Sequence, residues 1–169
     1  MSLKLKKSLT LILLAVLVGG FHSFAAPKKG KEVGLQLYSV REAIKKTDIK
    51  TVIQQVGAMG YKIVEAAGYS DGKLYGMEPA AFKALCEANG LNFYSSHCGQ
   101  AVPDQAGWDA CMKWWDTCIA AHKAAGVKYI VQPFMDKVGY ESLAGLKRYC
   151  DYFNAVGAKC NAAGIRFGY

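Results

Sequence analysis

Candidate binding side chains stand at the ends of four short apolar runs of this sequence. They offer one carboxylate, one imidazole, one guanidinium, one phenol and two amides: Glu65, His97, Arg41, Tyr38, Gln36 and Gln132. In parallel α/β folds the carboxyl ends of the strands share one edge, and functional side chains gather there. We therefore expect these six residues to form a polar rim that binds a substrate.

Glu65 is the sharpest of these candidates, because it lies within the apolar run Ile63-Val64-Glu65-Ala66-Ala67. A carboxylate in such a run is costly to bury without a partner. It is either a substrate-binding or acid/base group, or a structural carboxylate paired with a neighbouring arginine or lysine. His97 leaves a similar choice between a ligand for a metal ion or a hydroxyl group and a histidine that packs the rim.

Other arrangements of reactive residues carry less weight. Ser95-Ser96 lacks the G-x-S-x-G turn of a serine hydrolase. His97-Cys98 is a poor zinc pair, because adjacent residues at a strand end point to opposite faces. His122 lies in the middle of an expected helix and is interpreted as structural, and Gln132 ends a strand with at most a modest binding role. We assign no catalytic residue and no metal ligand in this chain.

A short phrase, repeated four times, predicts the elements that position the rim. It reads Ala, any residue, Gly, apolar, polar, apolar, and its glycines are Gly60, Gly90, Gly126 and Gly164. Each glycine follows an amphipathic stretch, and glycine ends a helix in the left-handed conformation without steric cost. A helix-glycine-strand phrase at this period predicts consecutive βα units and a parallel sheet.

We expect five strands that alternate with four helices. The strands cover residues 32–38, 61–67, 91–96, 128–131 and 165 onward, and the helices cover residues 49–59, 79–89, 108–125 and 142–163. No G-x-G-x-x-G fingerprint and no P-loop follows a strand, which disfavours the nucleotide-binding open sheets. The order of elements by itself fits both a doubly wound open sheet and a piece of a (β/α)8 barrel.

Residues 1–25 have the layout of a secretory signal peptide, and residues 26–31 that of a basic linker. Three lysines precede an apolar run over residues 9–18, and small residues follow it. The run is shorter than the roughly 20 residues of a membrane span, so membrane contact is expected only through a retained signal segment. We expect an exported, periplasmic protein with one domain over residues 32–169.

The charge distribution disfavours a nucleic-acid partner, and the spacing of the cysteines disfavours a disulfide framework. The formal net charge is +8 at pH 7, but the lysines and arginines outside the leader are scattered. Without a basic stripe we expect no nucleic-acid partner.

Six cysteines in an exported chain could form disulfides. However, Cys111 and Cys118 are two turns apart on one expected helix, and Cys150 and Cys160 are similarly separated on another. We interpret the cysteines as small buried thiols.

Several segments resemble one protein family. Residues 34–41, GLQLYSVR, resemble the opening strand of the sugar phosphate isomerase/epimerase family, the xylose isomerase-like TIM barrels. Residues 57–65, GAMGYKIVE, resemble its second strand with the strand-ending glutamate. Residues 95–97 resemble its third strand end, and residues 164–169 resemble the start of its fifth strand. The resemblance covers nearly all of residues 32–169.

The resemblance implies a partial (β/α)8 TIM barrel of about four βα units and a fifth strand. Family members use a divalent metal (manganese, magnesium or zinc) and two carboxylates to move a proton between neighbouring carbons of a sugar. Those groups lie on strands five to eight, so no metal is expected for this chain alone. The six rim residues would bind a small-molecule sugar.

We therefore expect the amino-terminal half of an exported sugar isomerase or epimerase, from a truncated or split gene, that is inactive alone. A non-catalytic carbohydrate-binding or assembly subunit is an alternative, and a keto-glycoside lyase of the same fold is another. A half-barrel exposes an inner apolar face and two sheet edges. A homodimer or a complementing C-terminal half could cover them.

Overall fold

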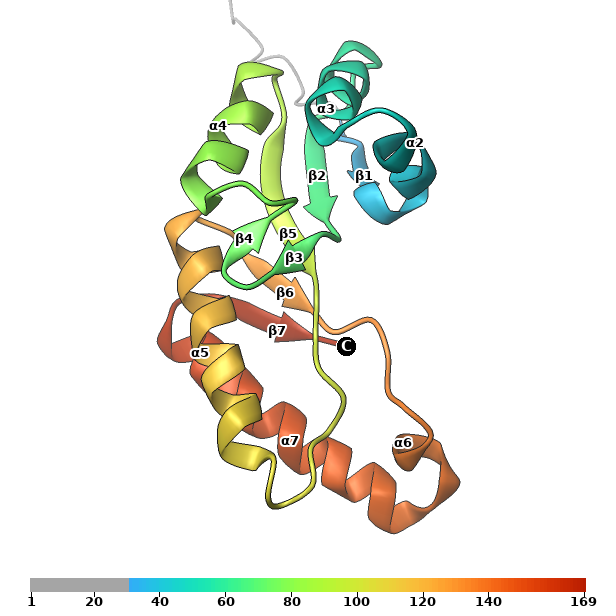
Figure 1. Ribbon diagram of the computed structural model, residues 1–169, viewed down its shortest axis with the longest axis vertical. Helices are drawn as coiled ribbons and strands as arrows, with labels where there is room; N and C mark the ends of the chain where they lie inside the picture. Colours follow the sequence, from blue (N-terminus) through green and yellow to red (C-terminus); the bar gives the residue numbers. More distant parts are fainter. Residues whose placement is uncertain (1–30) are drawn as a thin grey trace, which may run out of the picture. The chain divides into compact units, whose positions relative to one another are not determined.

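A parallel five-stranded sheet is the centre of the computed structural model, which describes residues 31–169 (Figure 1). Its strands are β1 (Gly34–Gln36), β2 (Ile63–Ala66), β5 (Asn92–His97), β6 (Tyr129–Val131) and β7 (Arg166–Gly168). They lie in chain order, β1-β2-β5-β6-β7, and every neighbouring pair is parallel. This order has no reversal, as in a (β/α)8 barrel, whereas a doubly wound sheet reverses at its switch point.

Four helices connect successive strands, as the sequence predicted. They are α3 (Ile49–Ala58), α4 (Pro79–Ala88), α5 (Trp108–Ala124) and α7 (Leu143–Ala162). Their ends agree with the repeated phrase, because its four glycines have φ between +71° and +92°. These backbone angles suit glycine and strain most other residues. At the start of α3, the Asp48 carboxylate accepts a hydrogen bond of 2.9 Å from the backbone N–H of Thr51.

Five short elements were not predicted. They are the 3-10 helix η1 (Leu37–Val40), the helices α2 (Arg41–Lys46) and α6 (Val138–Glu141), and the hairpin strands β3 (Tyr69–Ser70) and β4 (Lys73–Leu74). The predicted first strand therefore ends early, because the chain turns into η1 after Gln36. Each of these elements is too short to show a periodic apolar pattern.

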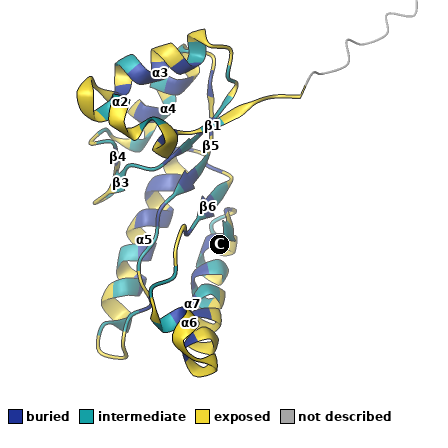
Figure 2. Cartoon of the chain, turned by 90° about the vertical axis from the view of Figure 1, so that its right-hand side faces the viewer, coloured by how far each residue is buried: buried dark blue, intermediate teal, exposed yellow. Residues whose placement is uncertain are grey.

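The helices cover one face of the sheet. The fully buried strand side chains within the described residues are Val64, Ala66, Ser96 and Ile130, and Phe93 is almost as buried. These buried residues gather where the helices meet the strands (Figure 2). The opposite face carries Gln36, Glu65, Ser95, Tyr129 and Arg166 in one row. The open face is thus polar and aromatic in this row, and the expectation of an apolar inner face is wrong there.

Two separate cores lie between the helices and the sheet. The aliphatic core joins α3 and α4 to β2 and β5, and Ile53, Val64 and Phe82 are fully buried in it. The aromatic core joins α5 and α7 to β6, and Trp115 and Tyr152 are fully buried in it. Each core is made by two consecutive βα units.

The structure does not describe the predicted leader. The signal peptide over residues 1–25 and nearly all of the linker over residues 26–31 lie outside the described residues. Within residues 31–169, no helix combines the length and the apolar character needed to cross a membrane.

Candidate functional site

The polar row on the open face follows from the register of the strands. Gln36 of β1 lies opposite Glu65 of β2, and Glu65 lies opposite Ser95 of β5. The pairing of β2 with β5 is irregular next to Glu65, so that Val64 faces Phe93 and Glu65 faces Ser95. This bulge skips Tyr94 and places the Ser95 hydroxyl beside the carboxylate.

Glu65 is held by two short hydrogen bonds within this row. The Gln36 amide donates to Oε1 over 2.6 Å, and the Ser95 hydroxyl donates to Oε2 over 2.6 Å. No arginine or lysine among residues 31–169 forms an ion pair with Glu65. Of the two interpretations, the structural ion pair is therefore wrong for the described residues. A carboxylate has about four acceptor positions, so Glu65 keeps acceptor capacity for a ligand hydroxyl.

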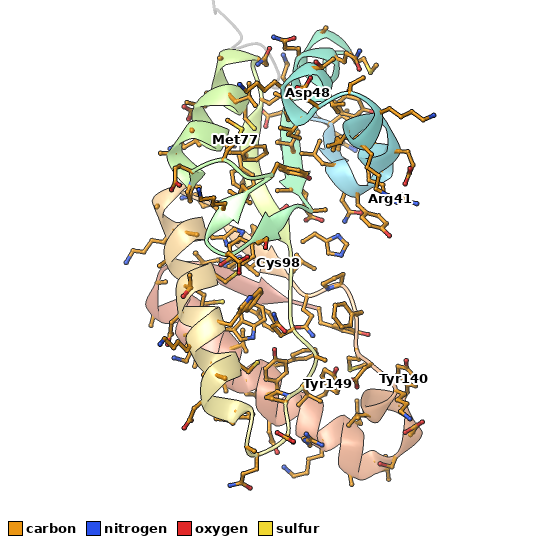
Figure 3. All side chains as sticks on the ribbon, viewed as in Figure 1. Arg41, Asp48, Met77, Cys98, Tyr140 and Tyr149 are labelled. Atoms are coloured by element: carbon orange, nitrogen blue, oxygen red, sulfur yellow. The ribbon has the colours of Figure 1, made fainter. Side chains whose placement is uncertain are left out.

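Tyr38, Arg41 and His97 form a second group at the rim. The Arg41 guanidinium lies 4.3 Å from the centre of the Tyr38 ring and donates a hydrogen bond of 3.0 Å to the Tyr38 carbonyl. The His97 ring meets the edge of Tyr38 at a centroid distance of 5.9 Å. His97 Nδ1 is buried and has no partner within the described residues. Figure 3 labels Arg41 at the start of α2.

A small cavity lies beside this second group. Its volume is about 170 Å³, and Tyr38, Arg41 and Tyr75 are among the residues that line it. Arg41 is largely exposed, and a guanidinium has five N–H donors. One donor is bound to the Tyr38 carbonyl, and Nε lies 3.7 Å from the Glu42 carboxylate. The remaining N–H groups can bind an anionic or hydroxyl group of a ligand.

Gln132 has a different environment from the other five predicted residues. Its side chain is fully buried, and its amide nitrogen donates to the carbonyl oxygens of Gln100 and Phe134 over 2.8 and 3.0 Å. These hydrogen bonds connect the loop that follows β5 to the loop that follows β6. A contact between Gln132 and a substrate stays a prediction.

The rim does not fit the divalent metal of the family. Glu65 is its one carboxylate among the predicted residues, and two protein donors already bind it. Within residues 31–169, the one group of three close metal-ligating side chains is Cys98, Cys118 and His122, which is buried in the protein. The six rim residues therefore do not form a site for that metal.

The cysteines agree only in part with the predicted buried thiols. All six are free; Cys86, Cys98, Cys118 and Cys160 are buried, whereas Cys111 is half-buried and Cys150 is exposed. The approach of Cys98 to Cys118 was missed, because it joins a strand end to a helix 20 residues later. No sequence period reports such a contact.

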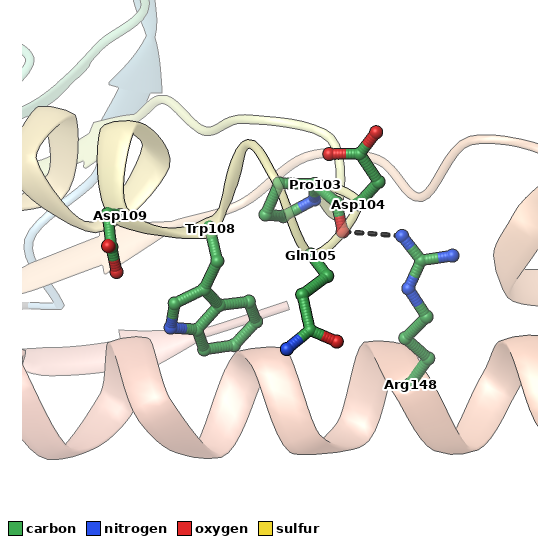
Figure 4. A pocket seen from close by; sticks show the side chains of 6 residues that line it. All are labelled: Pro103, Asp104, Gln105, Trp108, Asp109 and Arg148. Carbon is green, nitrogen blue, oxygen red and sulfur yellow. Dashed lines mark hydrogen bonds between the residues drawn. The ribbon is translucent and has the colours of Figure 1, made fainter.

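A second polar pocket lies away from the Glu65 row, between the loop after β5 and helix α7 (Figure 4). Its volume is about 500 Å³, and its lining residues are Pro103, Asp104, Gln105, Trp108, Asp109 and Arg148. The Arg148 guanidinium donates a hydrogen bond to the Pro103 carbonyl, which fixes the loop on α7. An indole beside carboxylates, an amide and a guanidinium suits a polyhydroxylated ligand.

Solved structures resemble this arrangement of strands and helices. One sugar phosphate isomerase/epimerase from Parabacteroides distasonis is 32% identical, with a TM-score of 0.74, over 83% of this chain and 54% of that protein. The fold is that of a partial xylose isomerase-like TIM barrel. A second Parabacteroides distasonis sugar phosphate isomerase/epimerase is 24% identical, with a TM-score of 0.71, over 86% of this chain and 52% of its own.

More distant barrels share the same fold. A D-psicose 3-epimerase from Clostridium cellulolyticum, solved with D-tagatose, is 20% identical, with a TM-score of 0.60, over 81% of this chain and 51% of its own. The sequence matches no protein-family model, and no curated protein matches it. The predicted resemblance to the sugar phosphate isomerase/epimerase family is confirmed, and the chain spans about half the length of these xylose isomerase-like barrels.

Proposed function

We propose that this chain binds a sugar at its rim and supplies the substrate-orienting part of a sugar isomerase or epimerase. The observation that carries the proposal is the Gln36–Glu65–Ser95 row, a hydrogen-bonded carboxylate on the open face of the sheet. The 32% identity to a sugar phosphate isomerase/epimerase supports the class of substrate.

The rim residues would hold the sugar through hydroxyl groups. Glu65 accepts from a sugar hydroxyl, because each of its oxygens uses only one acceptor position within the protein. Arg41 donates to a ring oxygen or to a phosphate, which a planar guanidinium can bind through two N–H groups. His97 is close to Tyr38 and supplies a further polar contact at the same edge.

Proton transfer in the family uses two carboxylates and a divalent metal, whereas Glu65 is the one carboxylate among the six rim residues. An isomerase or epimerase uses a base to remove a proton from carbon. The family's manganese, magnesium or zinc ion would stabilise the charge that develops. We therefore propose that this chain alone turns over sugars little or not at all.

Export and assembly belong to the same proposal. The basic, apolar and small-residue layout of residues 1–25 supports a periplasmic location.

The strands β1 and β7 are the two edges of the sheet, and unpaired edges favour association. A second copy, or a polypeptide that provides the remaining strands, would cover the edges and the open face.

A binding experiment with the full chain tests the proposed sugar site. D-tagatose and D-fructose are the probes, and saturation-transfer NMR measures their affinity. Glu65→Gln should weaken binding at least ten-fold, because a hydrogen bond to a charged acceptor contributes about 1.5–3 kcal/mol. Glu87→Gln on α4 is the matched control, since Glu87 is exposed and its ion pair to Lys83 is long, at 3.8 Å.

Two results would contradict the proposal. One is the absence of sugar binding by the folded wild-type chain. The other is robust epimerisation of ketoses by this chain alone with added manganese or magnesium, which would show that its own residues transfer the proton.

A non-catalytic carbohydrate-binding subunit is the second candidate, and the pocket around Trp108 favours it. Sugars stack on exposed indole faces through their apolar C–H surface. If Trp108→Ala abolishes sugar binding and Glu65→Gln leaves it unchanged, this second candidate replaces the first. A keto-glycoside lyase would differ by releasing a free sugar from a keto-glycoside in the same turnover experiment.

A further inference from the structure

Two thiols and an imidazole meet in the interior, away from the Glu65 row. Cys98 follows β5, and Cys118 and His122 lie four residues apart on α5, so that they share one face of the helix. The two sulfur atoms are 3.6 Å apart. The His122 ring lies beside Cys118, with Nδ1, the nitrogen next to the Cys118 carbonyl oxygen, 3.4 Å from Cys118 Sγ. The three donor atoms lie within 4.8 Å of one another, and all three residues are buried.

His122 has the hydrogen bonding of a metal ligand. Its Nδ1 lies 2.7 Å from the Cys118 carbonyl oxygen, to which it can donate, and its Nε2 is buried without a partner in the described residues. Metal-bound histidines often donate their other ring N–H to a backbone carbonyl in this manner.

The spacing of the sulfur atoms suits a bound ion better than a disulfide. Two thiolates at about 2.3 Å from a tetrahedral zinc ion are about 3.8 Å apart. A disulfide requires about 2.0 Å between the sulfur atoms. The observed 3.6 Å is the contact of two free thiols; it is close to the first value and far from the second, so that an ion could bind both sulfur atoms with little movement.

Charge balance also favours an ion at this place. A lone thiolate is unstable in a buried interior. Two thiolates together with one divalent cation carry no net charge, so that their burial is much less unfavourable. Soft sulfur donors with an imidazole select zinc over magnesium or calcium.

The geometry points to a buried zinc site formed by Cys98, Cys118 and His122. On binding, two S–H bonds break, two sulfur–zinc bonds form, and two protons pass to the solvent. The imidazole adds the third protein donor. The site differs in place and in donor type from the rim metal of the family, and it is independent of the proposed sugar binding.

The site would join β5 to α5 just beyond the rim. Cys98 directly follows His97, and Figure 3 labels Cys98 near the end of β5. Tyr69 of the β3–β4 hairpin packs against the His122 ring at a centroid distance of 5.0 Å. A zinc ion would therefore stabilise the strand end that carries Ser95 and His97.

A cobalt titration of the fully reduced, folded full chain tests this site. Cobalt is the spectroscopic probe, because a thiolate-to-cobalt charge-transfer band appears only when sulfur binds the ion. We expect the band to saturate at one equivalent, zinc to displace the cobalt, and two protons to be released per ion in weak buffer.

Single substitutions test which side chains bind the ion. Cys118→Ser and Cys98→Ser should each remove most of the band, and His122→Gln should weaken zinc binding at least ten-fold. Cys86→Ser is the matched control, because Cys86 is another buried thiol but belongs to the aliphatic core, and it should bind like the wild type. Reduced, folded wild type without a charge-transfer band would overturn the site, and so would a Cys98–Cys118 disulfide that reforms in place of metal uptake.

Discussion

The aliphatic and aromatic cores are built from different side chains, although consecutive βα units form both. In the aliphatic core, Ile53, Leu74 and Phe82 are fully buried and offer no side-chain polar atoms. In the aromatic core, Trp115 and Tyr152 are fully buried, and the indole N–H of Trp115 donates to the Tyr152 hydroxyl over 2.7 Å. One core is stabilised by apolar burial, whereas the other also carries hydrogen bonds inside it.

The two halves of the sheet also differ in the loops that follow their strands at the rim. In the aliphatic half these loops contain their own short elements, η1 with α2 and the β3–β4 hairpin. In the aromatic half, the loop between β5 and α5 has no helix or strand, the loop after β6 contains the short helix α6, and core tyrosines bind both loops. The Tyr149 hydroxyl accepts hydrogen bonds from the backbone N–H groups of Val102 and Asp136, over 3.2 and 3.0 Å.

The largest expected effect is a truncation in the aliphatic core. Phe82→Ala should lower the free energy of unfolding by about 3–5 kcal/mol, because it leaves a cavity among fully packed neighbours. Phe82 meets Phe93 edge to face at 5.0 Å, so that ring contact is lost as well. Urea unfolding measures the change, and Phe82→Leu is the conservative control. A loss below about 1 kcal/mol would contradict the conclusion that apolar burial stabilises this core.

The second effect distinguishes the aromatic core. Tyr149→Phe keeps the ring but leaves two backbone N–H groups without their acceptor, so we expect a loss of about 1–3 kcal/mol. The amides of Val102 and Asp136 should also exchange hydrogen faster. Tyr140→Phe is the control, since Tyr140 is 70% exposed. Equal stability of both variants would contradict the role given to the hydroxyl.

The smallest effect concerns alkaline pH. Burial raises the pKa of Cys86 in the aliphatic core to about 12 from an ordinary value of 9.0. The unfolded chain therefore releases the Cys86 proton above pH 9 while the folded chain keeps it, and stability falls between pH 9 and 12. At pH 10 this amounts to about 1 kcal/mol. Denaturation at pH 7.5 and 10 should show a smaller decrease for Cys86→Ala than for the wild type; an equal decrease would contradict the raised pKa.

The sequence predicted the long elements because their signals are local. The Ala-x-Gly phrase placed four helix ends and the strands after them, and Asp48 was a correct N-cap. The elements α2, α6 and the β3–β4 hairpin have six residues or fewer and show no period.

The sequence predicted which residues lie at the rim but not how they contact one another; their role in binding stays a prediction. Gln36 and Glu65 were both expected at the rim, and they do form a hydrogen bond. Ser95 was missing from the predicted set because its place beside Glu65 depends on the bulge between β2 and β5. The approach of Cys98 to Cys118 depends on how α5 packs against β5, which no pattern within either segment reveals.

The order of the strands has a consequence for how this chain acquires its structure. Since each strand of the large sheet pairs with the one made before it, every new βα unit can dock onto an existing edge as it becomes available to fold. No earlier segment has to wait for a distant partner, and no strand must be inserted between two others. Growth from one side in this manner limits strand pairing to neighbouring βα units, which keeps sequence separations shorter than in a sheet whose strand order reverses.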